Sequence, residues 1–368
     1  MNNQIKDVFF KLLRMGLWGK NDESLCAFPL SREEWSLIYE IALSQTVEGI
    51  VYDGILLLPN AYYPPYDLLL RWTARIDAIE RYNKRVRGAL AKLIEGFARN
   101  SISVVLLKGL GLAENYRKPL LRVSGDIDLL FENEAVYDRA NSLLKSRGYK
   151  VNKGDHNSVF YSFNTIEVEH HTKMIDIFNP FKQKFISELI ESEAGRSKKI
   201  TVDGQEVTIP SYLMSHIQAN AHILKHYMGF GIGLRQVCDI AMLCNAKDEG
   251  FNGDDLKSIY SKLDMDKWMN VMHNILVKNL GLNPSKLPYP IEKDCNISPI
   301  LDDFMYSGNF GFHEVRFREN SASISRRYHK RDNIYKRVVP HWIKLLKLVP
   351  TEVMWYPLFK MYSKVTGK

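Results

Sequence analysis

The chain has 368 residues, of which 45% are hydrophobic and 25% charged, as is typical of a folded globular protein with more than one domain. No apolar run reaches the roughly 18 residues of a membrane-spanning helix, and the charged N-terminus lacks the features of a signal peptide. Four scattered cysteines show no metal-ligand spacing and no disulfide framework, so we expect reduced thiols and a cytoplasmic protein.

The first 100 residues are predicted to be helical. Ser31 and Glu34 form a capping-box pattern at the start of one helix. The stretch from Tyr66 keeps its apolar residues at helical spacing for more than eight turns, which predicts a long amphipathic helix ending near Asn100.

An α/β unit is expected over residues 101–205, because the hydrophobic pattern changes there. "SISVVLLKG" and "DIDLLF" are predicted as buried strands with a short helix, "LGLAENY", between them. A helix follows, with Asn133 as its N-cap and Gly148 after its end. Two more strands are expected to join near Asn164 and Thr165, which completes a compact α/β core.

A second helical domain is expected over residues 206–312, and a basic, aromatic-rich tail over residues 313–368. The tail holds 13 Lys and Arg against 4 Asp and Glu, so the rest of the chain is close to neutral despite the overall charge of +8. We expect its helices to be solvated on one face and packed on the other. Binding to an anionic partner, RNA or a membrane surface, is the alternative.

The strongest chemical signal is a set of carboxylates on two predicted strands. Strand alternation places Asp126 and Asp128 on one face, and it gives Glu167, Glu169 and His171 a common face on a later strand. Adjacent carboxylates repel unless a cation lies between them, and oxygen ligands favour Mg²⁺ or Mn²⁺. Three such carboxylates on adjacent strands suit two metals that support phosphoryl or nucleotidyl transfer.

Further residues fit the same chemistry. Gly109 ends a strand just before the short helix, so backbone amides there are accessible to a phosphate. Lys108 supplies a positive charge for phosphates, and Arg122 is four residues before Asp126, within reach of phosphates or carboxylates.

The motifs "LLKGLGLAENYRKPLLRVSGDIDLLF" and "VEHH" resemble the uncharacterised bacterial nucleotidyltransferase-like family of the polymerase-β superfold. The resemblance implies an α+β fold with a short mixed sheet, flanked by helical regions. It also implies an NTP substrate, with Lys108 and Gly109 at the nucleotide loop and Asp126, Asp128 and Glu169 as metal ligands. His171, the histidine that follows the third carboxylate, is expected to contact the nucleotide, with a structural hydrogen-bonding role as the equal alternative. The wider superfold usually has Gly-Ser where this chain has Lys108-Gly109, so the serine hydroxyl that commonly holds a phosphate is absent.

Several residues have two interpretations. Glu169 is preferred over Glu167 from the resemblance alone. His156 is expected in a solvated loop rather than in the cleft. His222 and His226 are four apart on a predicted helix, where core packing is favoured over lining the far wall of the cleft. Arg235 and Asp239 are expected to form a helix-surface ion pair, with a triphosphate contact for Arg235 as the alternative.

The predicted function is therefore transfer of NMP from an NTP to an unidentified hydroxyl-bearing acceptor, which could be a small molecule, a protein or an RNA. The alternatives are a non-catalytic protein that binds a nucleotide or macromolecule on the same fold, and a toxin-like enzyme that modifies tRNA.

Overall fold

A computed structural model of the chain describes residues 3–21, 24–154, 158–229, 231–246, 248, 250–311 and 334–366. His156 therefore lies outside the described residues, and so does the first part of the basic stretch, residues 312–333.

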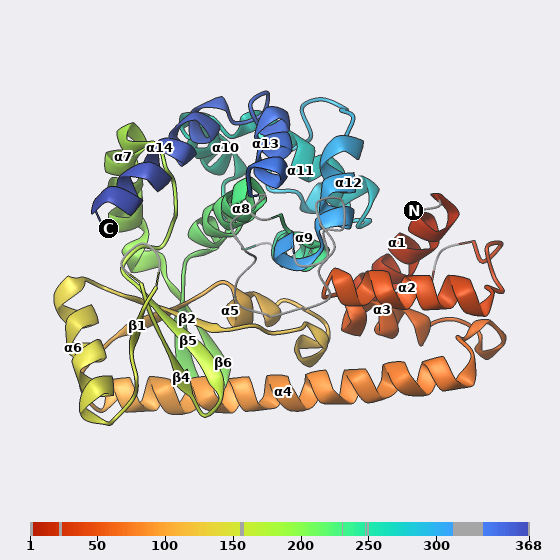
Figure 1. The fold of residues 1–368 in the computed structure, drawn as a ribbon, viewed down its shortest axis with the longest axis horizontal. Coiled ribbons are helices and arrows are strands. Elements are labelled where there is room, and N and C mark those ends of the chain that lie inside the picture. Colours follow the sequence, from red (N-terminus) through yellow and green to blue (C-terminus); the bar gives the residue numbers. More distant parts are fainter. Residues whose placement is uncertain are drawn as a thin grey trace.

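The N-terminal region is helical, as predicted. It contains α1 (Asn3–Trp18), α2 (Arg32–Ser44), α3 (Glu48–Ile55) and the 33-residue α4 (Tyr66–Ala98). The capping box of α2 is confirmed: Ser31 Oγ accepts a hydrogen bond from the backbone N–H of Glu34, and the Glu34 carboxylate accepts one from the backbone N–H of Ser31. Figure 1 shows α4 running from the N-terminal helices to the sheet, so this helix connects the two regions.

A seven-stranded mixed sheet forms the centre of the α/β core, and the predicted α+β fold with a short mixed sheet is confirmed. The central pairs are β1 with β2 (antiparallel), β2 with β5 (parallel) and β1 with β7 (parallel). In spatial order the strands are β3 (Asn152–Lys153), β4 (Val159–Phe163), β5 (Ile166–His171), β2 (Ile127–Phe131), β1 (Val104–Leu107), β7 (Gln205–Ile209) and β6 (Lys198–Val202). Strands β3, β6 and β7 are not predicted from the hydrophobic pattern of the sequence, and β7 extends the sheet beyond residue 205.

One face of the sheet is buried against α4 and α6 (Glu134–Ser146). Ile127, Leu129 and Phe131 alternate along β2 and pack with the C-terminal half of α4 and with α6 in one apolar cluster. Asn133 caps α6 as predicted, since its side chain accepts a hydrogen bond from the N–H of Val136. Asp128 therefore lies on the opposite face of β2.

A helical layer covers that opposite side of the sheet (Figure 1). Its helices are α7 (Gln183–Glu193), α8 (Tyr212–Gly229), α9 (Leu234–Asn245), α10 (Gly253–Lys262), α11 (Asp266–Lys278), α12 (Ser298–Ser307), α13 (Ile334–Leu345) and α14 (Pro350–Thr366). The two C-terminal helices pack on this layer: Trp342 donates a hydrogen bond to the carbonyl of Met228, and the Glu352 carboxylate accepts one from the N–H of Phe178. Among the described residues, no helix is long and apolar enough to cross a membrane.

Candidate active site

The two aspartates of "DID" occupy different environments. Asp128 is inside β2, is only 2% exposed, and is in register with Leu107 of β1 and Glu169 of β5. Asp126 precedes β2 by one residue and is exposed to solvent. One carboxylate is therefore buried in the sheet, and the other lies at the open end of the strand.

Asp128, Glu169 and His171 come together on the face of the sheet that is turned toward the helical layer. The Nε2 atom of His171 is 2.7 Å from Oδ1 of Asp128 and 3.6 Å from Oε2 of Glu169. One ligand atom from each of the three residues lies within 4.8 Å of the others. Glu167 is exposed on the same face of β5 and is not part of this cluster. Carboxylate and imidazole donors at this spacing form a possible metal site.

Lys108 projects toward the same cluster from the end of β1, with its Nζ atom 3.2 Å from Oδ1 of Asp128. The turn that carries it has a positive φ at two successive residues, +35° at Lys108 and +38° at Gly109. A positive φ at a residue with a Cβ is uncommon, and such conformations concentrate at functional sites. The following helix, α5 (Gly109–Ala113), has only five residues, so its dipole contributes little and the Lys108 ammonium is the main positive charge at this turn.

The charges of this cluster shift the pKa values of its members in opposite directions. Burial raises the pKa of Asp128, but the charge of Lys108 and the hydrogen bond from His171 outweigh it and bring the pKa to about 2. The nearby charge of Asp128 is the main cause that raises the pKa of Asp126 to about 6. Burial lowers the pKa of Lys108, but Asp128, Asp126 and Glu169 outweigh that effect, so its pKa is raised. Asp128 and Lys108 are therefore ionised at neutral pH.

Arg122 is predicted to contact the nucleotide, yet its guanidinium is already bound to another residue. It is 4% exposed and donates two hydrogen bonds to Asp239 of α9, at 2.7 and 2.6 Å. Tyr116 donates a third hydrogen bond to the same carboxylate at 2.7 Å. This buried group joins α9 to the loop that leads into Asp126.

The predicted surface ion pair between Arg235 and Asp239 is wrong on both points. Nearly all of α9 is buried, because it packs between α8 and the loop before β2. Asp239 pairs with Arg122 of that loop instead. Arg235 is 7% exposed and donates a 2.9 Å hydrogen bond to the carbonyl of Val123, in that same loop.

Asn83 of α4 holds this loop from the other side, and the sequence analysis did not identify it. Its side-chain amide donates hydrogen bonds to the carbonyls of Leu120 and Arg122, at 2.6 and 2.8 Å, and its oxygen accepts one from the N–H of Ser124. Asn83 is 3% exposed on an otherwise apolar face of α4. A lone amide on an apolar helix face is the sequence signal that could have identified it.

Helix α8 approaches Lys108, because Gln218 of this helix accepts a hydrogen bond from the Lys108 backbone N–H. His222 and His226 are half-buried there, with their rings in edge-to-face contact at 4.2 Å. Burial lowers the pKa of both rings, and the charge of Lys108 lowers it further. The expectation that the pair packs in the core, rather than lining the far wall of the cleft, stays a prediction.

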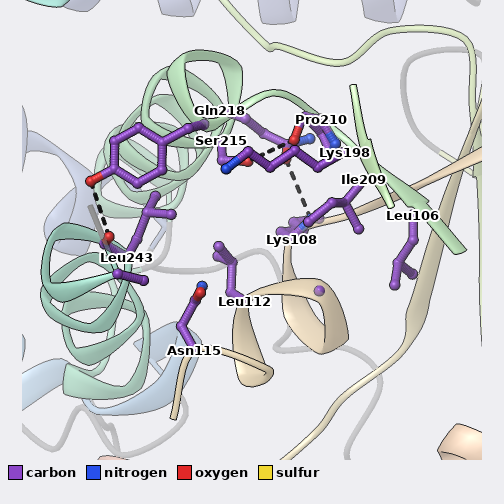
Figure 2. Close-up of a pocket in the computed structure, with 13 residues that line it drawn as sticks. Leu106, Lys108, Leu112, Asn115, Lys198, Ile209, Pro210, Ser215, Gln218 and Leu243 are labelled. Atoms are coloured by element: carbon purple, nitrogen blue, oxygen red, sulfur yellow. Dashed lines mark hydrogen bonds between the residues drawn. The ribbon is translucent and has the colours of Figure 1, made fainter. Parts of the chain in front are cut away.

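A pocket adjoins Lys108 where α5 faces α8 and α9 (Figure 2). Its cavity volume is about 70 Å³, well below the usual range for small-ligand sites. Gln218 of α8 is part of its wall, and its amide oxygen accepts a 3.3 Å hydrogen bond from the backbone N–H of Lys108. The remaining wall is mostly apolar and includes Leu106, Leu112 and Ile209.

Comparisons with known proteins place this site in context. The family described as "Uncharacterised nucleotidyltransferase" matches residues 31–273, which include α4, the whole sheet and helices α8 and α9. One solved structure, an antigenic nucleotidyltransferase-like protein from Paracoccidioides brasiliensis, is similar at 16% identity and a TM-score of 0.35. That similarity covers 54% of this chain and 93% of that protein. No curated protein sequence matches the chain. Since the family match spans more than half of the chain and includes every residue of the carboxylate cluster, the chain belongs to the uncharacterised nucleotidyltransferase family.

Proposed function

We propose that the protein is a Mg²⁺-dependent nucleotidyltransferase that transfers NMP from an NTP to a hydroxyl group of an acceptor. The observation that carries this proposal is the convergence of Asp128, Glu169 and His171 with the Lys108 ammonium at one end of the sheet. A cluster of acidic ligands beside a lysine suits both a divalent cation and the phosphates of a nucleotide.

The donor set fits Mg²⁺ or Mn²⁺. Asp128 and Glu169 offer carboxylate oxygens on adjacent strands, and the exposed Asp126 can add another from the end of β2. The raised pKa of Asp126 supports a role as metal ligand. The charge of Asp128 raises that pKa, and a bound metal would offset this charge and favour the ionised form of Asp126. When bound, such metals neutralise the developing charge on the phosphates and the attacking oxygen.

Each of the other residues of the site has a separate role in the proposed reaction. Lys108 holds the phosphate tail by charge, and His171 orients the Asp128 carboxylate through their 2.7 Å hydrogen bond. Glu169 takes the proton of the acceptor hydroxyl as its oxygen attacks the α-phosphorus. The bond from the α-phosphorus to the bridging oxygen breaks, and pyrophosphate leaves with that electron pair.

The test uses the full chain with each of the four NTPs labelled at the α-phosphate, in the presence of Mg²⁺ or Mn²⁺. We expect metal-dependent binding of at least one NTP, and labelled NMP transferred to the protein or to a component of an acceptor library. The variant Asp126→Ala/Asp128→Ala should lose both properties. Glu167→Ala is the matched control, because it removes an exposed carboxylate from the same face of β5 outside the cluster.

The outcomes separate the alternatives. Nucleotide binding without transfer to any acceptor would favour the non-catalytic protein, and transfer confined to tRNA would identify the toxin-like enzyme. If no NTP binds with either metal, or if Glu167→Ala acts like the double variant, the proposed site is wrong.

A further inference from the structure

The C-terminal helices leave an unpartnered apolar surface on the outside of the molecule. Among the side chains that the structure describes on α13, the turn after it and α14, the exposed large apolar ones form one i, i+4, i+7 row on each helix. We call these two rows the terminal face. Its members are 40–66% exposed: Val339, Ile343, Leu346, Met354, Leu358 and Met361.

The opposite sides of both helices are firmly anchored. On α13, His341 is 1% exposed with its Nδ1 atom 3.1 Å from the carbonyl oxygen of Tyr227, and Leu345 is fully buried. On α14, Val353 and Tyr356 are buried, and the ring of Tyr356 packs edge-to-face on Phe178 at 4.8 Å. The terminal face is therefore the outward side of helices that are already folded onto the protein, and it does not need a partner to be helical.

The positive charge of this segment favours an anionic partner. Residues 334–368 contain seven Lys and Arg and a single acidic residue, Glu352. Glu352 is 1% exposed and faces inward, where it accepts a hydrogen bond from the N–H of Phe178, so no carboxylate of these helices opposes an anionic surface. Lys347 is exposed next to Leu346.

We infer that the terminal face binds the surface of an anionic lipid bilayer, with both helices lying in the interface plane. Exposed aliphatic rows flanked by lysines are the pattern of interfacial helices. Phe181, which is 82% exposed and packs edge-to-face on Trp355, adds aromatic side chains of the kind found at lipid headgroups. Aliphatic rows fit RNA poorly, because single-stranded RNA is bound through aromatic stacking and duplex RNA through polar contacts.

Figure 1 shows α13 and α14 along the outer edge of the helical layer, on the other side from the sheet and α4. A membrane bound there would leave the candidate active site, at the sheet end of the cleft, in solution. The bilayer would thus leave the site with Asp126 and Lys108 uncovered.

The experiment measures co-sedimentation of the full chain with lipid vesicles of phosphatidylcholine, with or without about 30% phosphatidylglycerol, at low and high salt. We expect binding to the anionic vesicles only, and binding should weaken as salt is added because the lysines act through a screened surface potential. The variant Ile343→Ser/Leu358→Ser should lower the partition coefficient at least tenfold. Both side chains are more than half exposed, so the protein should still fold.

A matched control tests whether the loss of any two exposed apolar side chains, outside the terminal face, would also weaken vesicle binding. Leu37→Ser/Leu70→Ser removes two leucines that are 54% and 57% exposed on α2 and α4, and it should leave vesicle binding unchanged. The inference is overturned if wild-type protein stays in the supernatant, or if the control loses binding as much as the test variant. It is equally overturned if the terminal face instead supports a dimer in sedimentation equilibrium, or RNA binding in place of vesicle binding, that Ile343→Ser/Leu358→Ser removes. None of these outcomes depends on nucleotidyl transfer.

Discussion

Replacing the two aspartates of the site by asparagine should change the stability of the metal-free protein in opposite directions. Asp128 is buried and its pKa is lowered to about 2, whereas the pKa of Asp126 is raised to about 6. Asparagine keeps the shape of the side chain and removes the charge. We expect Asp128→Asn to destabilise the metal-free protein and Asp126→Asn to stabilise it, although both should abolish nucleotide turnover.

The magnitude for Asp128 follows from its pKa. A carboxylate whose pKa falls from an ordinary 3.8 to about 2 on folding stabilises the folded state by about 2 kcal/mol when it is ionised. This contribution is complete above pH 4 or so and disappears as the pH falls through about 2. At neutral pH, Asp128→Asn should therefore lower the free energy of unfolding by about 2 kcal/mol.

The pH dependence for Asp126 has the opposite sign. Its folded pKa is above its ordinary value, so folding favours the protonated form, and the ionised form weakens the fold at higher pH. The gain from Asp126→Asn should be complete above about pH 6 and should shrink to zero as the pH falls toward 4. Because Asp126 is exposed, we expect solvent to screen much of this gain.

The assay is urea denaturation of wild type and both variants in EDTA at about pH 7.5 and pH 4.5, repeated with Mn²⁺ at the higher pH. Mn²⁺ should raise the urea midpoint of wild type, because a ligand that binds only the folded state stabilises it. Mn²⁺ should raise the urea midpoint of either variant by less than that of wild type. If both variants destabilise the metal-free protein equally, or neither changes it at any pH, the electrostatic description of the cluster is wrong.

Three more predictions follow from the same contacts. The apparent affinity for Mn²⁺, measured by titration calorimetry, should fall by up to about tenfold per pH unit below pH 6, because the metal must displace a proton from Asp126; a flat profile would exclude Asp126 as a ligand. Asp239→Asn should lower the free energy of unfolding by about 3–5 kcal/mol, because it leaves the Arg122 charge buried without its partner; a change below about 1 kcal/mol would argue against the buried pair. Asn83→Ala should cost about 1–3 kcal/mol and speed hydrogen exchange across residues 120–126; unchanged exchange there would mean that other contacts hold the loop.

Local sequence patterns predicted much of the fold that lies next to the site. Alternation in "IEVEHH" correctly separated the side chains of β5, since Ile166, Val168 and His170 are buried and Glu169 and His171 are half-buried on the other face. The same alternation correctly grouped Glu169 with His171. Capping signals located α2 and α6 because a cap is made by residues three positions apart.

The hydrophobic pattern does not predict the β6–β7 hairpin, although the sequence contains a characteristic turn dipeptide there. Asp203-Gly204 separates two short strands, both residues have positive φ, and Asp-Gly is a strong hairpin signal. The strands "KKITV" and "QEVTI" are half polar, so their hydrophobicity alone did not mark them. Adding the turn chemistry would have extended the predicted core past residue 205.

The contacts that hold the site loop could not be predicted in this way. Arg122 and Asp239 are 117 positions apart, and Asn83 lies 39 positions before the Arg122 carbonyl it binds. Periodicity reports which side of an element is buried, but it does not report which distant element lies there. The charge of Arg122 in the sequence favours a nucleotide contact, and the structure adds what the sequence does not indicate: its guanidinium pairs with Asp239 between α9 and the loop.

Lys108, which stands where the wider superfold has a serine, has an electrostatic role that a serine could not have. A serine hydroxyl can hold a phosphate, but it carries no charge to offset three neighbouring carboxylates when substrate is absent. Lys108 does offset them, because its ammonium lies 3.2 Å from Asp128 and its pKa is raised by all three. In the proposed enzyme, a divalent cation held by Asp126, Asp128 and Glu169 would supply that neutralisation instead, and the Lys108 ammonium would then be free to bind the phosphates. Lys108 would therefore stabilise the metal-free site and also hold the phosphates in the proposed metal-loaded site, whereas a serine could do only the second.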